Sequence, residues 1–181
     1  MSGHSKWAQI KHKKAIIDVK RAGVFGKIAR AITVAAREKG SDPNANPTLR
    51  TMIQKAREAN MPQDNIDRAI KKGSGEGEEA LQEFTYEAYG PGGVAIVLTG
   101  ITDNNNRTSN EIKHLLSGHG GKWANPGSVL WAFEKKENEW EPKPYTMVSV
   151  DTKTEEALFR LMEVLDEHDD VQEVYANNTE S

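Results

Sequence analysis

The stretch Gly73-Ser74-Gly75-Glu76-Gly77 decides how this chain is organised. Three glycines within five residues, directly after a helical pattern, are typical of a helix end followed by a flexible link. The chain has 181 residues, which is enough for a small domain on each side of this link. We therefore expect one domain over residues 1–75 and a second over residues 79–181.

The charge of the chain divides at the same link. Residues 1–75 contain 16 Lys and Arg against 6 Asp and Glu, whereas residues 76–181 contain 8 against 21. The total of -3 therefore combines a half of net charge +10 with a half of net charge -13. A basic half favours a polyanionic partner such as DNA or RNA. The alternative is an accidental bias of a solvated surface, but the change of sign coincides with the link.

The basic half has the periodicity of helices. Apolar residues recur at three- and four-residue spacing over residues 24–38, and the cations Lys27, Arg30 and Arg37 fall on the opposite side. Asn46 and Pro47 then predict the N-cap and first residue of a second helix. Its apolar stripe would consist of Leu49, Met52, Ile53 and Ala56.

A third helix is expected to begin at Pro62 and to end with Lys71 and Lys72, with Gly73 as its stop. Three helices with short connections indicate a small helical domain.

Residues 5–14 mix cations with a single tryptophan, a combination that suits phosphate contacts together with base stacking. The alternative for Trp7 and Ile10 is that they dock this segment onto the helices, and we favour docking for Trp7. His4 and His12 lack a nearby third ligand, so no metal site is expected there. The candidate nucleic-acid contacts are Lys6, Trp7, Lys11, His12, Lys13, Lys14, Lys20, Arg21, Lys27, Arg30, Arg37, Arg50, Arg68, Lys71 and Lys72.

The acidic half alternates between strand and helix patterns. Thr108-Ser109-Asn110-Glu111 has the spacing of a capping box and predicts the start of the first helix of this half. The order β-β-α-β-β-α-β predicts an α+β domain with a ferredoxin-like β-α-β-β-α-β core, one extra strand, and both helices on one face. The expected strands are 84–89, 94–98, 128–133, 145–150 and 171–175, and the second helix is 154–167.

The sequence offers little for catalysis. There is no cysteine, which excludes disulfides and thiolate chemistry. The stretch Glu167-His168-Asp169-Asp170 is interpreted as a helix end with a solvated turn rather than a metal cluster. We expect no enzymatic activity, cofactor or metal, although a site assembled only in space is not visible in a sequence. Apolar runs fall far short of the ~20 residues that span a bilayer, and no secretion signal precedes them, so a cytoplasmic protein without a membrane partner is expected.

The N-terminal stretch Gly3-His4-Ser5-Lys6-Trp7 and the stretch Ile10-Lys11-His12 resemble the signature of the YebC/PmpR family. The resemblance continues through most of the chain, including Tyr89-Gly90-Pro91-Gly92-Gly93 and Asn106-Arg107-Thr108. The chain departs from the family pattern at residues 122–124. It also has only the polar connector 134–144 where members usually carry an inserted third domain.

This resemblance implies a non-enzymatic regulator of gene expression, of the type described as a probable transcriptional regulatory protein, which binds DNA through the basic domain. The same resemblance implies an alternative, a ribosome-associated translation factor that binds RNA and eases elongation through proline-rich stretches. A protein-binding adaptor that acts through the acidic domain is a second alternative. The basic half shows no helix-turn-helix pattern, so binding dominated by phosphate contacts is expected.

Overall fold

The computed structural model describes residue 7, residues 21–75 and residues 81–179. Their contacts form two compact units. The helical unit contains the described residues of Val19–Gln82 together with Ile101–Asp103, and the α/β unit contains the others.

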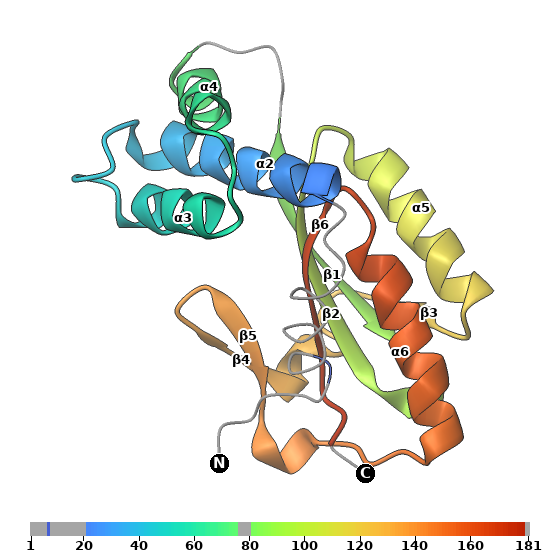
Figure 1. Cartoon of the computed structure of the whole chain (residues 1–181). Helices are drawn as coiled ribbons and strands as arrows, with labels where there is room; N and C mark the ends of the chain where they lie inside the picture. Colours follow the sequence, from blue (N-terminus) through green and yellow to red (C-terminus); the bar gives the residue numbers. More distant parts are fainter. Residues whose placement is uncertain (1–6, 8–20, 76–80, 180–181) are drawn as a thin grey trace. The chain divides into compact units, whose positions relative to one another are not determined.

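The helical unit consists of α2 (Arg21–Lys39), α3 (Pro47–Glu58) and α4 (Gln63–Ser74), labelled in Figure 1. The predicted start of α3 is confirmed. Asn46 is its N-cap, and its side chain accepts a hydrogen bond from the Leu49 backbone N–H at 3.0 Å. The Asn46 side-chain amide also donates to the backbone carbonyls of Ala35 and Gly40 at 2.8 Å each, which fixes the turn between α2 and α3.

The core of this unit forms where α2 packs against α3 and α4. Its buried members include Ile32, Leu49, Ile53 and Ile66, which lie on the apolar stripes of the three helices. The predicted stripe of α3 is therefore confirmed, with Met52 partly buried at its margin.

The prediction that Gly73 stops the third helix is wrong. Gly73 lies buried inside α4, which ends at Ser74 with Gly75 as its C-cap. A Cβ atom on Gly73 would stand 2.3 Å from the Thr33 carbonyl oxygen and 2.8 Å from the Ala36 Cβ. This glycine therefore permits the close approach of α4 to α2 rather than a turn.

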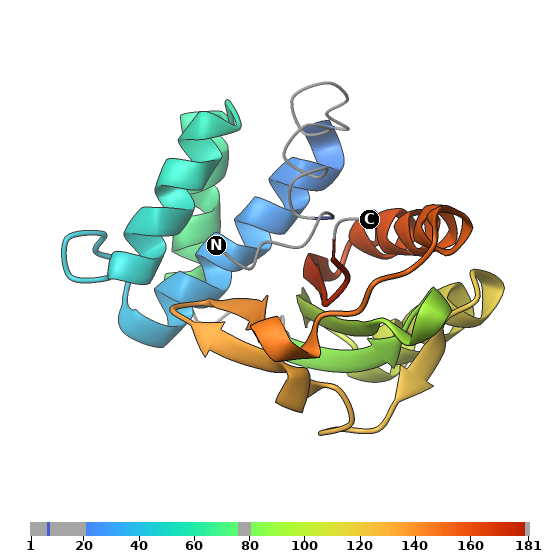
Figure 2. The same ribbon diagram turned by 90° about the horizontal axis from the view of Figure 1, so that it is seen from below.

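The α/β unit is built on a four-stranded sheet with the strand order β3-β1-β2-β6. Its strands are β1 (Gln82–Tyr89), β2 (Ala95–Thr102), β3 (Lys122–Ala124) and β6 (Val171–Ala176). The helices α5 (Asn105–Gly118) and α6 (Thr152–Asp166) lie along one face of this sheet, as Figures 1 and 2 show.

The sheet has the strand arrangement of a ferredoxin-like core. The unit β2-α5-β3 leaves a gap of one strand between β2 and β3, and β1 fills it, forming a hairpin with β2 through η1 (Pro91–Gly93). β3 is antiparallel to β1, and β6 is antiparallel to β2. The predicted α+β class is confirmed, and the strand predicted as an addition is a central member of the sheet.

Two of the predicted strands are wrong. Residues 130–132 form the 3-10 turn η2 (Leu130–Ala132), and residues 144–146 form η3 (Pro144–Thr146). Between them, β4 (Phe133–Lys136) and β5 (Glu139–Pro142) make a separate two-stranded hairpin. The backbone N–H groups of Val129 and Leu130 donate to the Glu87 carboxylate instead of a strand neighbour. Residues 145–150 contribute an isolated parallel bridge between Val148 and Asn178 rather than a strand.

The predicted capping box is also wrong. α5 begins one turn earlier, at Asn105, and its N-cap is Asn104, whose side chain accepts from the Arg107 backbone N–H at 3.1 Å. Thr108 is a buried residue within the first turns of the helix. Asn104 is an equally good capping residue by type, so the four-residue motif alone selected the wrong start.

Strand residues alternate between two cores on the two faces of the sheet. Ile96 and Leu98 face the helices, in a core with Leu158 and Leu161 of α6. Ala95 and Val97 face the other side, where residues 124–133 cover them. None of the helices in the described part of the chain is long and apolar enough to cross a membrane.

Candidate functional site

The predicted nucleic-acid contacts divide into those that the structure describes and those that it does not. Arg21 begins α2, but its side chain is outside the described part. The remaining candidates outside the described residues are Lys6, Lys11, His12, Lys13, Lys14 and Lys20.

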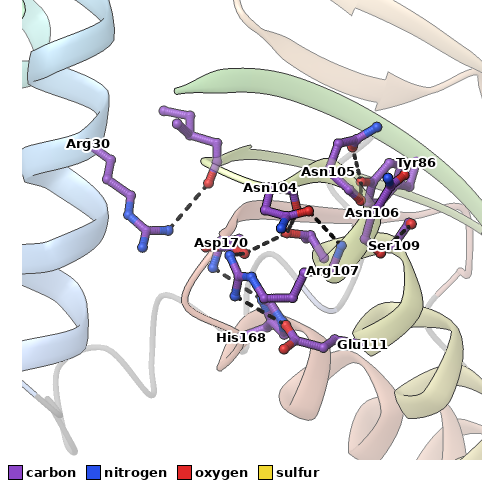
Figure 3. A network of polar contacts seen from close by, with 12 residues as sticks. Arg30, Tyr86, Asn104, Asn105, Asn106, Arg107, Ser109, Glu111, His168 and Asp170 are labelled. Atoms are coloured by element: carbon purple, nitrogen blue, oxygen red, sulfur yellow. Dashed lines mark hydrogen bonds and ion pairs between the residues drawn. The ribbon is translucent and has the colours of Figure 1, made fainter. Parts of the chain in front are cut away.

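The cations of α2 are less available than the helical pattern predicts. Lys27 and Arg30 are half-buried. The Arg30 guanidinium donates to the Ile101 carbonyl at 3.4 Å, a contact within the helical unit that Figure 3 shows. Arg37 is exposed, and its guanidinium donates to the Leu81 carbonyl at 3.2 Å. These side chains already have partners in the fold.

The cations of α4 are more available. Arg68, Lys71 and Lys72 are exposed and, at spacings of three and four residues, lie on one face of the helix. Arg68 and Lys71 make no ion pair with any described residue. The opposite face of α4 is buried through Ile66, Ala69 and Gly73, so this cationic face is directed to solvent.

Exposed cations also occur on α3. Arg50 is exposed and donates to the Pro43 carbonyl at 3.1 Å. Lys55 and Arg57 are exposed and make no ion pair with described residues. Neither was among the predicted contacts, although the position of Lys55 opposite the stripe Leu49, Ile53 and Ala56 could have identified it.

Trp7 is buried, with 3% of its surface exposed. Its ring centroid lies 6.1 Å from that of Phe159 on α6, and it belongs to the core between the sheet and its helices. Docking is thus the observed role of Trp7. Its site is the α/β unit, however, and not the helical unit as the sequence suggested.

A second cluster of polar side chains surrounds Asp170, at the start of β6 (Figure 3). Asp170 is completely buried, and its Oδ2 accepts from Arg107 Nη2 at 2.8 Å and from Thr108 Oγ1 at 2.7 Å. The interpretation of residues 167–170 as a solvated turn is therefore wrong for Asp170. Two donors from α5 satisfy the buried carboxylate, as burial of a charge requires.

His168 connects this carboxylate segment to α5. Its Nδ1 accepts from the Asp170 backbone N–H at 3.1 Å, so the neutral ring carries its proton on Nε2. Nε2 lies 2.8 Å from Glu111 Oε2, and Glu111 in turn lies 3.5 Å from Arg107. The result is a chain of charges and hydrogen bonds that ties the first two turns of α5 to β6.

Tyr86 borders the same network, where its hydroxyl donates to the Asn105 side chain. Burial raises the pKa of Tyr86, and the negative charge of Asp170 raises it further. The phenol is therefore neutral at physiological pH and acts as a hydrogen-bond donor.

Glu111, His168 and Asp170 each bring a ligand-type atom within 4.8 Å of the others. The donor set does not suit a metal ion, because the Arg107 guanidinium already supplies the positive charge at Asp170. A metal on His168 Nε2 would also require a proton on Nδ1, the atom that accepts from the Asp170 N–H. We interpret this cluster as an internal salt-bridge network.

Glu87 is a further buried carboxylate that the sequence did not single out. It accepts three backbone hydrogen bonds, from Gly127 at 2.5 Å, Val129 at 2.8 Å and Leu130 at 2.9 Å. These bonds shape the loop after β3. No local signal distinguishes Glu87 from an exposed strand residue, since its partners lie 40 or more residues away.

Two family models match this chain. The model described as "TACO1/YebC protein N-terminal domain" matches residues 5–76, and that described as "TACO1/YebC second and third domain" matches residues 81–138 and 135–178. The basic helical unit and the α/β unit thus correspond to recognised parts of one class of protein, and the chain belongs to the TACO1/YebC family.

Several relatives are described as probable transcriptional regulatory proteins. One from Rubrobacter xylanophilus is 41% identical over 237 residues, covering 98% of this chain and 95% of the relative. Another from Fervidobacterium nodosum is 57% identical over 137 residues, covering 75% of this chain and 54% of the relative, so that match spans about half of the relative's length. A crystal structure of a conserved hypothetical protein from Aquifex aeolicus, 35% identical, superimposes with a TM-score of 0.85 over 96% of both chains.

Proposed function

We propose that this protein is a non-enzymatic regulator of gene expression that binds nucleic acid through its helical unit. The observation that carries the proposal is the set of exposed cations on α3 and α4, of which Lys55, Arg57, Arg68 and Lys71 make no ion pair with described residues. Lysine and arginine side chains in this state are suited to phosphate contacts. The description of the relatives as probable transcriptional regulatory proteins supports a role in gene expression.

The proposed mode of binding is recognition of the phosphate backbone. α2, α3 and α4 pack through their apolar stripes, which leaves the cations of α3 and α4 on outward faces. Contacts of this kind fix a protein on nucleic acid and make its affinity depend on salt, without reading the base sequence. Duplex DNA is the proposed partner, and structured RNA, including that of the ribosome, is the alternative target for the same surface.

The chain is proposed to be a compact member of its family that lacks an inserted domain. Its alignment with the Rubrobacter relative extends over 237 residues, more than the 181 of this chain. The two matches to the second-and-third-domain model meet at residues 135–138, in the β4–β5 hairpin. A short hairpin at this point supports the absence of a further domain there.

Direct binding measurements test the proposal. Fluorescence anisotropy with labelled duplex DNA and labelled structured RNA would compare the wild type with Arg68→Glu/Lys71→Glu. We expect at least a ten-fold loss of affinity at low salt, because two phosphate contacts become repulsions. A matched control is Lys122→Glu/Lys153→Glu, which makes the same change of charge at exposed positions of the α/β unit. Equal losses in both variants would refute the assignment to the helical unit.

Fractionation of cell lysate on a sucrose gradient separates the two targets. Co-migration with ribosomes that disappears at high salt would favour the translational role, whereas retention on DNA and absence from ribosomes would favour the transcriptional role. The Arg68→Glu/Lys71→Glu variant should lose whichever association the wild type shows.

A further inference from the structure

The helix α2 consists of two halves that differ in how well they are packed. Residues 32–36 are all buried, whereas none of residues 23–31 is buried. In the first half, Phe25 and Ile28 only border the core of the helical unit, and Val24 is 36% exposed. Because tertiary packing supplies most of the stability of a helix in a protein, the first half of α2 is held less firmly than the second.

Two glycines weaken the first half of α2 further. Gly23 and Gly26 lie inside the helix, and neither has a positive φ. In the described part of the chain, no atom would lie within 4 Å of a Cβ placed on either of them. Neither backbone conformation nor close packing therefore requires glycine here, in contrast to Gly73. Each glycine favours the unfolded segment, because alanine would form the helix more readily.

The charge of this part of the chain also opposes helix formation. Residues 19–37 contain five Lys and Arg and no Asp or Glu. α2 begins with Arg21 and has no acidic residue in its first turn. A cation at the start of a helix is unfavourable with the helix macrodipole, and Lys27 and Arg30 are like charges three positions apart. A polyanion would relieve both effects, because it would neutralise these cations.

We propose that residues 21–31 are a conditional segment, which opens readily in the free protein and is fixed as a helix when the phosphate backbone of nucleic acid binds. Opening costs the bond from Arg30 to the Ile101 carbonyl, whose length of 3.4 Å is near the upper limit for a hydrogen bond. Phosphates interact most favourably with the cations of the helical form, so binding and helix formation support each other. The inference rests on nucleic-acid binding by the helical unit and adds a disorder-to-order step to it.

Hydrogen exchange of the full chain, followed by mass spectrometry, measures the conditional segment directly. In the free protein we expect the amides of residues 25–31, beyond the first turn, to exchange at least about ten-fold faster than those of residues 32–39. A saturating DNA duplex, or structured RNA if the duplex does not bind, should slow the exchange of residues 25–31 and leave that of α6 unchanged.

Gly23→Ala/Gly26→Ala should favour the helix before binding. We expect slower exchange of residues 25–31 in the free variant and an affinity about two- to ten-fold higher, because less order has to be gained on binding. Gly118→Ala is the matched control, since Gly118 is an exposed glycine of α5 with no described atom within 4 Å of its absent Cβ. The control should change neither the exchange of residues 25–31 nor the affinity.

Three results would overturn the inference while the proposed function stands. The first is binding of nucleic acid that leaves the exchange of residues 25–31 unchanged. The second is equal exchange of the two halves of α2 in the free protein. The third is an unchanged or lower affinity of Gly23→Ala/Gly26→Ala when circular dichroism shows this variant folded. If neither duplex DNA nor structured RNA binds the wild type, the proposed function fails and the inference fails with it.

Discussion

The Arg107 guanidinium lies 2.8 Å from the carboxylate of Asp170, although the two residues are 63 positions apart in the sequence. Of the two, only Asp170 is fully buried. The Arg107 side chain remains 42% exposed. This pair joins the start of α5 to the start of β6, and Thr108 and His168 complete the attachment.

Removing the guanidinium should destabilise the α/β unit. Arg107→Ala removes the guanidinium that faces the buried Asp170 carboxylate, while the Thr108 hydroxyl still donates to it. We expect a loss of about 2 kcal/mol in the free energy of unfolding, which is less than the ~3–5 kcal/mol of a fully buried broken pair because water reaches the arginine. The four tryptophans, at 7, 123, 131 and 140, all belong to this unit, so urea unfolding followed by tryptophan fluorescence reports on it alone. Asn110→Ala, exposed on the same helix, should change the stability by less than about 0.5 kcal/mol.

The Gly73 position should not tolerate a methyl group. Gly73→Ala would bring Cβ to 2.3 Å from the Thr33 carbonyl oxygen, so α4 must move away from α2. We expect a loss of about 1–3 kcal/mol from the helical unit, measured by thermal unfolding with circular dichroism at 222 nm.

Two other glycines provide matched controls for that substitution. Gly75→Ala places its Cβ 3.5 Å from the Lys71 carbonyl oxygen, an ordinary contact, and should cost little. Gly26→Ala lies within α2 with no atom within 4 Å, so it should stabilise the helix by about 0.5–1 kcal/mol. Similar losses in all three variants would contradict the close approach of α2 and α4.

Glu87 should be essential for the loop that follows β3. Glu87→Gln keeps the shape but replaces one acceptor oxygen with an NH2 group that faces backbone N–H donors. We expect a loss of about 2–3 kcal/mol in urea unfolding followed by tryptophan fluorescence, because charge-assisted hydrogen bonds are lost and donors stay buried. Glu83→Gln makes the same change at an exposed position of β1 and should have no measurable effect.

Salt dependence should count the phosphate contacts of α4. The slope of log affinity against log salt should be steep for the wild type and shallower by about two in Arg68→Ala/Lys71→Ala, because each lost cation releases one counterion fewer. Anisotropy titrations at several salt concentrations measure both slopes. A slope that is the same in the two proteins would place the phosphate contacts elsewhere in the chain.

Alkaline pH should weaken the α/β unit through Tyr175. Burial raises the pKa of this phenol far above its ordinary value of 10.0, and Glu173 and Glu139 raise it further. The neutral phenol is thus favoured in the folded state, so its contribution to stability is complete below pH 10 and is lost as pH rises through the folded pKa. Urea midpoints measured from pH 8 to about 11.5 should fall less in Tyr175→Phe than in wild type, and parallel curves would exclude Tyr175 as the cause.

The sequence by itself determined the features that depend on near neighbours. Periodicity and residue type predict three such features, and each is present in the structure. They are the helical stripe of Leu49, Ile53 and Ala56, the Asn46 cap, and the buried strand after Gly93. The reversal of charge near Gly75 is likewise a property of the sequence, and it separated a basic helical part from an acidic α+β part.

Tertiary structure alone decided the features whose partners are distant. By residue type Gly73 is typical of a helix stop, but in the structure it lies inside α4, where a Cβ atom would be 2.3 Å from the Thr33 carbonyl oxygen of α2. By its sequence neighbours Asp170 is typical of a solvated turn, but in the structure it is buried and accepts hydrogen bonds from Arg107 and Thr108 of α5. The strand expected at residues 128–133 is lost because Glu87, some 40 residues earlier, takes its backbone donors. Tertiary structure also decided which cations are available for phosphate contacts. Arg30 donates to the Ile101 carbonyl and Arg37 to the Leu81 carbonyl, both far away in the sequence. Arg68 and Lys71, in contrast, are directed to solvent.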